Sequence, residues 1–152
     1  MKSEVKFQEV RTEPLANDRI PEFVPEITRT LGSWGHTRIK VTHGFGCNLP
    51  IDRLWQAIEI ATPQLAFFIE RSLREGTFRY GRCDLHIEDL QETLEFKLCH
   101  ESDVHFASTD PNLVEQVITL WRRDGIALFA SPGPKGSALR KEWKQIGADS
   151  EA

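Results

Sequence analysis

Alternation of apolar and polar residues predicts several short strands along this chain. The period of two is clear in "TRIKVTH" (37–43) and recurs in "EVKFQEVR" (4–11). Three more alternating stretches lie between 78 and 108, namely "FRYGRCDLHIE", "TLEFKLC" and "DVHFAS". The apolar run "IALFA" (126–130) is typical of a buried strand. We therefore expect a sheet of short, mainly antiparallel strands.

Helical spacing of apolar residues predicts two longer helices. Between 50 and 74 apolar residues recur every three or four positions, and Thr62 before Pro63 indicates a restart or a kink. We expect one long kinked helix there, or two abutting ones. The clearest helix is at 109–125, where Asp110 is the predicted N-cap and a glycine ends the pattern.

The pattern divides the chain into a core and two terminal extensions. Residues 1–31 hold a first strand and a proline-punctuated arm, with a helical turn from Pro25. Residues 32–131 form the core domain, and 132–152 form a linker with a short C-terminal helix or tail. This order predicts an α+β fold, a two-layer sandwich in which helices pack on one face of a mainly antiparallel sheet. The other face of the sheet is then exposed.

Composition narrows the function classes. The chain has 152 residues, a formal charge of −4 and a pI near 5.7, and this net negative charge disfavours nucleic acid as a partner. Its three cysteines show no CxxC spacing, which favours reduced thiols and a cytoplasmic location. The chain start has no apolar core of a signal peptide, and no apolar run is long enough for a membrane span.

One short stretch, "CHESDVH" (99–105), gathers the side chains from which metal sites are built. It lies between two alternating strands whose apolar residues must share one face of the sheet. This places Leu98 opposite Val104 and leaves 100–102 for a hairpin turn. We therefore interpret the stretch as a turn between two strands.

A second pairing separates the histidines of this region. Matching Leu85 to Leu94 across the preceding hairpin moves His86 four residues along the sheet from His105, about 13 Å away. The first pairing also sets Lys97 beside His105, and a cation there opposes metal binding. We therefore expect no metal ion and no cofactor.

The loop "HGFGCNLP" (43–50) holds the candidates for nucleophilic chemistry. His43 precedes Cys47 by four positions, and the N-terminus of a following helix lowers the pKa of a nearby thiol. The alternative is a plain turn, in which Gly44 and Gly46 supply positive φ. The sequence shows no third residue that orients His43, so it favours the turn and predicts no catalytic residue.

Two residues of the loop "GSWGHTR" (32–38), Trp34 and His36, are candidates for contact with a ligand or partner. A tryptophan between glycines either folds back on the core or contacts another molecule. Both readings stay open at this point.

The expected outer sheet face suggests a function. A basic row (Arg82, Lys97, His105) adjoins an acidic row (Asp84, Glu95), and such rows complement each other in a two-fold dimer. We expect a non-catalytic intracellular binding or interaction module whose partner is a protein, a homodimer being the simplest case.

Two alternatives remain. One is a small-molecule-binding protein, or an enzyme, with its site at the loop from His43 to Cys47. The other is an immunity-type inhibitor of a basic toxin, which only size and acidity suggest.

Overall fold

The structure is a computed structural model that describes residues 6–129. Its strands are β1 (Gln8–Arg11), β2 (Arg38–His43), β3 (Ala57–Ala61), β4 (Leu85–Asp89), β5 (Leu94–Leu98) and β6 (Val104–Ser108). Its α-helices are α1 (Phe23–Ser33), α2 (Leu65–Glu75) and α3 (Pro111–Arg123), and short 3-10 helices span Ile20–Glu22 and Thr62–Gln64. The expected linker and helix at 132–152 lie outside the described residues.

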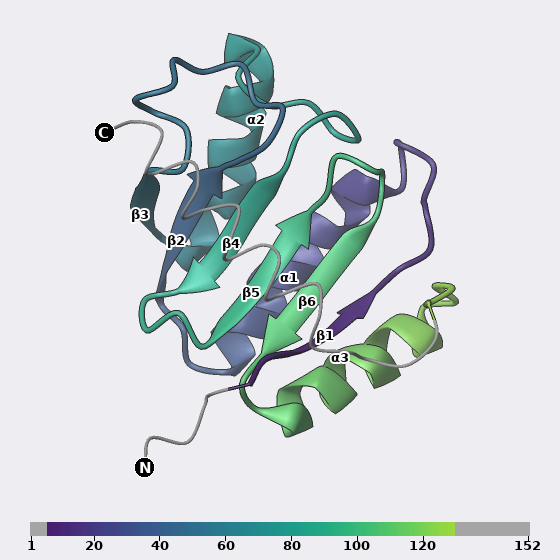
Figure 1. Ribbon diagram of the computed structural model, residues 1–152. Helices are drawn as coiled ribbons and strands as arrows, with labels where there is room; N and C mark the ends of the chain where they lie inside the picture. The colour runs from purple at the N-terminus through teal and green to yellow at the C-terminus, as the bar shows by residue number, and fades with distance from the viewer. Residues whose placement is uncertain (1–5, 130–152) are drawn as a thin grey trace.

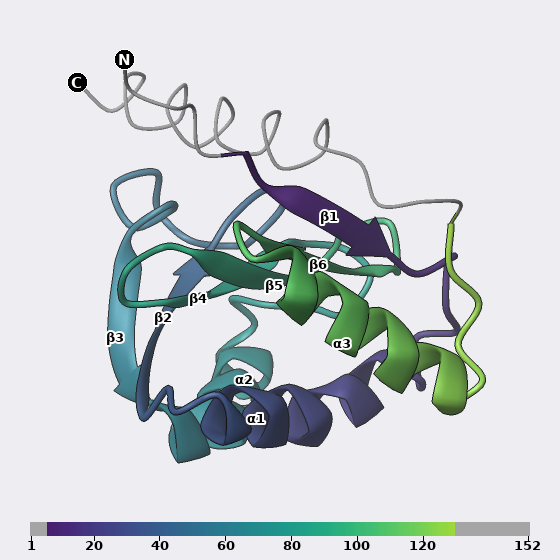
Figure 2. The same ribbon diagram turned by 90° about the horizontal axis from the view of Figure 1, so that it is seen from below.

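All six strands join one antiparallel sheet in the order β1-β6-β5-β4-β2-β3 (Figure 1). The helices lie on one side of it, with α1 and α2 beneath the sheet and α3 near β1 and β6 (Figure 2). The predicted α+β fold is confirmed. Among residues 6–129, none of the helices combines the length and the apolar character that crossing a bilayer requires.

The core lies between the sheet and the helices. Inward apolar residues form rows across the strands, since Leu98 lies opposite both Val104 and Leu85. The next row joins Ile87 to Phe96 and continues through β6 to β1. The predicted pairing of Leu98 with Val104 is confirmed.

The helix predicted at 109–125 is confirmed as α3. The Oδ1 atom of Asp110 accepts a hydrogen bond of 2.9 Å from the backbone N–H of Asn112, as an N-cap does. The buried side of α3 carries Trp121, whose ring meets Phe23 of α1 edge to face with 5.7 Å between centroids. The helix thereby packs against α1 as well as against the sheet.

Helix α1 is longer than the helical turn that Pro25 indicates. It begins at Phe23 and has 11 residues, and its buried residues alternate at helical spacing: Phe23, Val24, Ile27 and Leu31. Because these side chains are in the core, α1 is an integral part of the fold.

The helix predicted over 50–74 is wrong in its first half. The structure has strand β3 there, and α2 begins only at Leu65. Ile58 and Ala61 fit the helical spacing, whereas Ile58 and Ile60 alternate as in a strand, and the ladder to β2 decides between the two. The strand predicted at 126–130 is reduced, over its described part, to a single bridge between Leu128 and Thr12.

The predicted pairing of Leu85 with Leu94 is also wrong. Leu85 lies opposite Leu98, so the register of β5 against β4 is shifted by four residues from the expected one. Asp89 holds the turn between the two strands, because its Oδ1 atom accepts hydrogen bonds from the backbone N–H groups of Thr93 (2.7 Å) and Leu94 (3.1 Å). This register brings His86 opposite Lys97, and Lys97 lies opposite His105.

Candidate functional site

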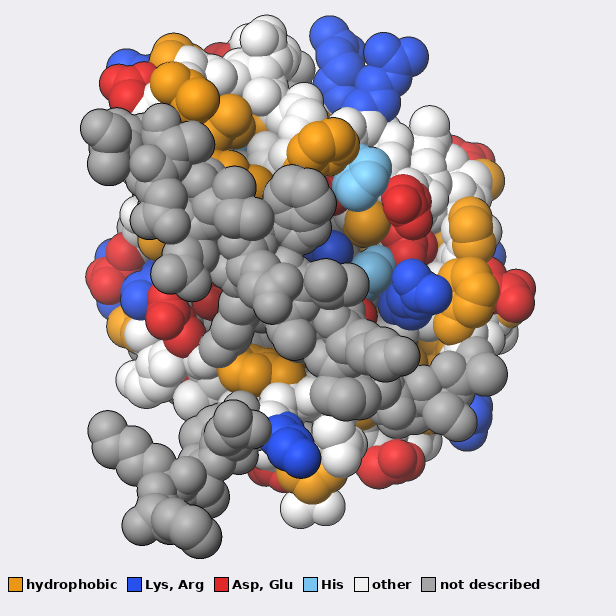
Figure 3. All heavy atoms as spheres, in the orientation of Figure 1, with side chains coloured by type: hydrophobic (Ala, Val, Ile, Leu, Met, Phe, Trp, Pro, Cys, Tyr) orange, Lys and Arg blue, Asp and Glu red, His pale blue; other side chains and the backbone are white. Residues whose placement is uncertain are grey.

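The outer face of the sheet, away from the helices, carries ionisable side chains in rows. One row runs His86, Lys97, His105 and Arg11 across β4, β5, β6 and β1. The neighbouring row includes Glu88, Glu95 and Glu9. Histidine, acidic and basic side chains therefore lie close together on this face (Figure 3).

The register corrects the expected rows in two ways. His86 lies opposite Lys97, whereas Arg82 precedes β4 and is not on a strand. Asp84 and Glu95 lie on opposite sides of the basic row and do not form one acidic row.

His86, Glu88, Glu95 and His105 are also buried, so the structure does not show the exposed charged face on which the dimer hypothesis relied. Self-association therefore stays a prediction.

Buried ion pairs connect the rows. His86 Nδ1 lies 2.6 Å from Glu95 Oε1. His105 Nε2 lies 2.7 Å from Asp103 Oδ2, and His105 Nδ1 lies 3.4 Å from Glu9 Oε1. Burial lowers the pKa of His105, but hydrogen bonds to Asp103, Cys99 and Glu9 outweigh it and raise that pKa to about 10.

The stretch "CHESDVH" is the β5–β6 hairpin turn, as predicted. The backbone N–H of Cys99 donates to the carbonyl oxygen of Asp103 at 2.9 Å, and the N–H of Ser102 donates to the carbonyl of Cys99 at 3.1 Å. Ser102 has φ +65°, the left-handed conformation that a tight turn requires.

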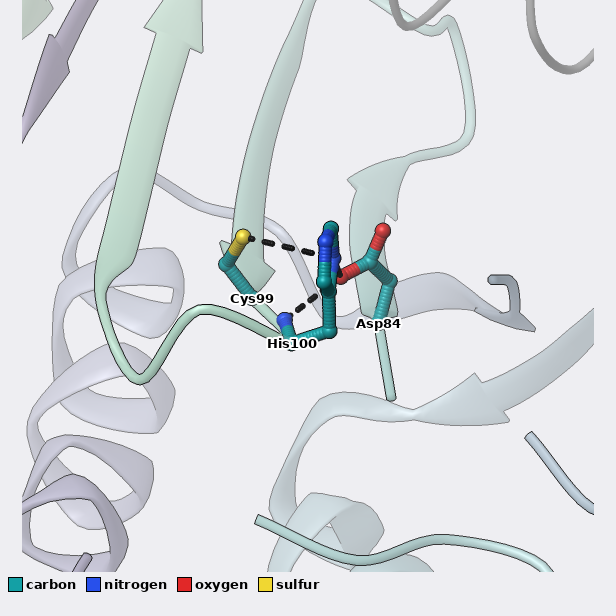
Figure 4. A group of neighbouring side chains, drawn as sticks. All are labelled: Asp84, Cys99 and His100. Carbon is teal, nitrogen blue, oxygen red and sulfur yellow. Dashed lines mark hydrogen bonds and ion pairs between the residues drawn. The ribbon is translucent and has the colours of Figure 1, made fainter. Parts of the chain in front are cut away.

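Two groups of metal-ligating side chains meet at this turn, and both include Cys99. In the first, His100 donates from its backbone N–H and holds its Nδ1 atom toward Asp84 Oδ1, at 2.7 and 2.8 Å (Figure 4). The second group consists of Cys99, Asp103 and His105, all buried. In each group the donor atoms lie within 4.8 Å of one another. The turn thus brings together donors that the sequence was expected to scatter.

A separate cavity lies on the other side of the sheet. It has a volume of about 460 Å³ and is lined by residues of β2, β3, α2 and the segments that follow β2 and α2. Its lining comprises His43, Leu49, Arg53, Gln56, Ile58, Ile60, Phe68, Arg71, Ser72, Glu75 and Thr77. His43 ends β2, so the strand itself carries this imidazole to the cavity.

The His43 side chain is buried and hydrogen-bonded. Its Nε2 atom lies 3.2 Å from Ser72 Oγ, and its ring lies against Phe68 with 5.5 Å between centroids. Burial lowers the pKa of His43, and the charge of Glu75 opposes this only in part. The imidazole is therefore neutral at pH 7.

His43 and Cys47 do not act as a pair in this structure. The Cys47 thiol donates to the carbonyl oxygen of Asp84 at 3.3 Å, while His43 turns to Ser72. A hydrogen bond with Cys83 and burial both raise the pKa of Cys47, the opposite of activation.

We therefore expect Cys47 to alkylate slowly at neutral pH. Iodoacetamide labelling across pH, read out by peptide mass, should give Cys47 no midpoint below the ordinary thiol value of about 8.5. A midpoint well below that value, abolished by His43→Ala, would make Cys47 an activated nucleophile.

The two loop candidates at 32–38 are tied to the fold. Trp34 Nε1 donates to Gln116 Oε1 at 3.0 Å, and its ring stacks on Phe96 with 6.4 Å between centroids. The carbonyl oxygen of His36 accepts a hydrogen bond of 2.6 Å from Thr62 Oγ1. The Trp34 ring is thus partly buried against the core, and contact of Trp34 or His36 with a ligand or partner stays a prediction.

Several site residues have no strong signal in the sequence. Arg53, Arg71 and Ser72 reach the cavity only because a strand interrupts the predicted helix. Glu9 approaches His105 only because β1 pairs with β6, a contact across most of the chain. An i to i+4 spacing from Arg71 to Glu75 is visible, but it indicates a surface ion pair.

Comparison with known proteins gives no further guidance: no family, no curated sequence and no solved structure matches this chain.

Proposed function

We propose that this protein binds a small organic anion with an apolar body in the cavity between β2, β3 and α2, without catalysing a reaction. The volume of about 460 Å³ falls within the range of small-molecule sites, about 300–1,000 Å³. The observation that carries the proposal is that one cavity combines an apolar wall, two arginines and a buried neutral histidine.

The apolar wall suits the body of such a ligand. Ile58 and Ile60 face the cavity from the edge strand β3, and Phe68 faces it from α2. Ile58 is 44% exposed, although it is a large apolar residue. A ligand that covers it removes apolar surface from water, which contributes about 25 cal/mol per Å².

The polar groups of the cavity suit the anionic end of such a ligand. Arg53 and Arg71 line the cavity, and guanidinium groups bind carboxylates and phosphates through paired hydrogen bonds. Arg71 Nε lies 3.0 Å from Glu75 Oε1, but both side chains are more than half exposed. Such surface pairs contribute at most about 1 kcal/mol, so a ligand anion competes with Glu75 at low cost.

The buried pair at the cavity supports binding and not catalysis. A serine acts as a nucleophile when a histidine, itself oriented by a third group, takes its proton. Within residues 6–129 no carboxylate hydrogen-bonds the remaining ring nitrogen of His43. His43 and Ser72 are each only 5% exposed and offer hydrogen bonds at the base of the cavity.

Fluorescence titration with 1-anilinonaphthalene-8-sulfonate, an aromatic sulfonate that brightens in apolar sites, tests this proposal. We expect saturable binding to the folded protein, weakened about tenfold by Arg71→Gln, because losing a charge-assisted contact costs about 1.4 kcal/mol. Arg74→Gln is the matched control, since Arg74 is on the same helix and does not line the cavity.

A second pair of variants tests the apolar wall. Phe68→Ala should weaken dye binding, whereas Phe67→Ala should not, because Phe67 is 59% exposed and does not line the cavity. Equal affinities of the Arg71→Gln and Arg74→Gln proteins, or no saturable binding to the wild type, contradict the proposal.

A further inference from the structure

We propose that Cys99, Asp103 and His105 form a binding site for Zn²⁺ at the end of the β5–β6 hairpin. Cys99 and Asp103 flank the turn, and His105 follows Asp103 on the same side of β6, since strand side chains alternate with period two. This site is on the outer face of the sheet and is independent of the cavity that binds the proposed anion.

The three donor atoms are close enough for one ion. They lie within 4.8 Å of one another, and His105 Nε2 is 2.7 Å from Asp103 Oδ2. Tetrahedral zinc with bonds of about 2.0–2.3 Å places its ligands about 3.5 Å apart. Small side-chain rotations therefore suffice to move the histidine away from the carboxylate and let an ion enter between them.

An unsatisfied buried oxygen points to the same place. Asp103 is 3% exposed, and its Oδ1 atom has no hydrogen-bond partner among residues 6–129. A buried polar atom without a partner costs about 1–3 kcal/mol, and buried carboxylates in proteins are paired or bind metal ions. A bound cation would satisfy this carboxylate.

Glu9 lies where a carboxylate commonly supports a zinc-binding histidine, next to the ring nitrogen that does not bind the metal. His105 turns Nε2 toward Asp103, and its opposite nitrogen, Nδ1, lies 3.4 Å from Glu9 Oε1. A carboxylate that receives the second N–H of a ligating histidine fixes its ring and raises its basicity. Strand β1 brings Glu9 to this position through its pairing with β6.

The donor types favour zinc over other common ions. A thiolate is too soft for Mg²⁺ or Ca²⁺, whereas a set of Cys, His and Asp suits Zn²⁺ and its spectroscopic substitute Co²⁺. Lys97 lies opposite His105 and opposes a cation. An entering ion displaces the protons of the Cys99 thiol and the His105 imidazolium to solvent, and the anions of Cys99, Asp103 and Glu9 then offset the charges of the ion and Lys97.

Titration with Co²⁺, followed by competition with Zn²⁺, tests the site on the full chain. We expect one equivalent to bind, with a thiolate-to-cobalt charge-transfer band and the intense visible bands of tetrahedral Co²⁺. Cys99→Ser and His105→Asn should each weaken binding at least 100-fold. Glu9→Gln should weaken it about 10–100-fold, as expected for a residue that orients a ligand. His36→Asn is the control and should bind as the wild type does.

The neighbouring group separates this site from the alternative one. His100→Asn should retain binding, because His100 Nδ1 lies 2.8 Å from Asp84 Oδ1 and makes only a long contact of 3.8 Å with Cys99 Sγ. If binding is lost in His100→Asn and kept in His105→Asn, the ion belongs to the Asp84 group and the proposal is wrong. The absence of the thiolate band, or binding unchanged in Cys99→Ser, also overturns it.

A measurement on the wild type does not depend on the folding of any variant. Zn²⁺ should slow the alkylation of Cys99 by N-ethylmaleimide at least tenfold and leave the rates of Cys47 and Cys83 unchanged. Equal rates at Cys99 with and without Zn²⁺ contradict the site.

Discussion

Trp121→Ala should lower the free energy of unfolding by about 3–5 kcal/mol. Trp121 is 1% exposed and is the largest of the fully buried side chains within residues 6–129. Its removal leaves a cavity between α3, α1 and the sheet and ends the contact with Phe23. Domains of this size have a total stability of about 5–15 kcal/mol, so the loss is a large fraction of the whole. Urea unfolding followed by circular dichroism measures it.

Leu120→Ala is the matched control for this prediction. Leu120 precedes Trp121 on the same helix and is only partly buried, so its truncation should cost about 1 kcal/mol. Equal losses in the two variants would show that α3 contributes through helix formation and not through the packing of Trp121.

The sequence predicts α3 well because several independent signals agree there. The N-cap at Asp110, the apolar stripe and the glycine after the helix all indicate the same boundaries, and all are local. The β5–β6 turn is predicted for a similar reason, since only one register keeps both apolar sets inside and the turn short.

Where two structures fit the same hydrophobic pattern, the sequence alone does not decide which of them forms. A shift of the β4–β5 pairing by an even number of residues keeps Leu85 and Leu94 inside, so both registers satisfy the alternation. The choice depends on Asp89, whose side chain bonds to Thr93 and Leu94 and closes a tight turn. Because the predicted row of His86 depends on that turn, the interpretation of the outer face changes with it.

Strand β3 shows the same limit with a larger effect on the candidate site. Ile58 and Ala61 fit a helix that continues into α2, whereas Ile58 and Ile60 alternate as in a strand, so the local pattern allows both. Only the ladder to β2 makes the segment a strand, and that ladder forms one wall of the cavity. The sequence pattern therefore does not predict the cavity, although it does single out His43, which lies at the base of the cavity.

The loop "HGFGC" needs its glycines for two different reasons. Gly46 has φ +79°, as the turn interpretation predicts, whereas Gly44 does not have a positive φ. A Cβ atom at Gly44 would lie 2.7 Å from His86 Nε2, so this glycine allows close approach instead.

Gly46→Ala should destabilise the protein by about 2–5 kcal/mol. A non-glycine residue in the left-handed region costs about 1–2 kcal/mol. The new Cβ would also lie 2.5 Å from the carbonyl oxygen of Arg82, a backbone atom that can move only with its segment. Overpacking of this kind costs about 1–3 kcal/mol. Thermal and urea unfolding of the variant measure the sum.

Gly76→Ala separates the clash from the cost of the backbone conformation. Gly76 caps α2 with φ +73°, and a Cβ atom there would meet nothing within 4 Å. Its substitution should therefore cost only about 1 kcal/mol. Gly46→Ala should also weaken binding of the anilinonaphthalene dye, because relief of the clash moves the loop that carries Leu49 and Arg53 to the cavity. If both substitutions destabilise equally and neither changes dye affinity, the position of this loop does not depend on the contact between Gly46 and Arg82.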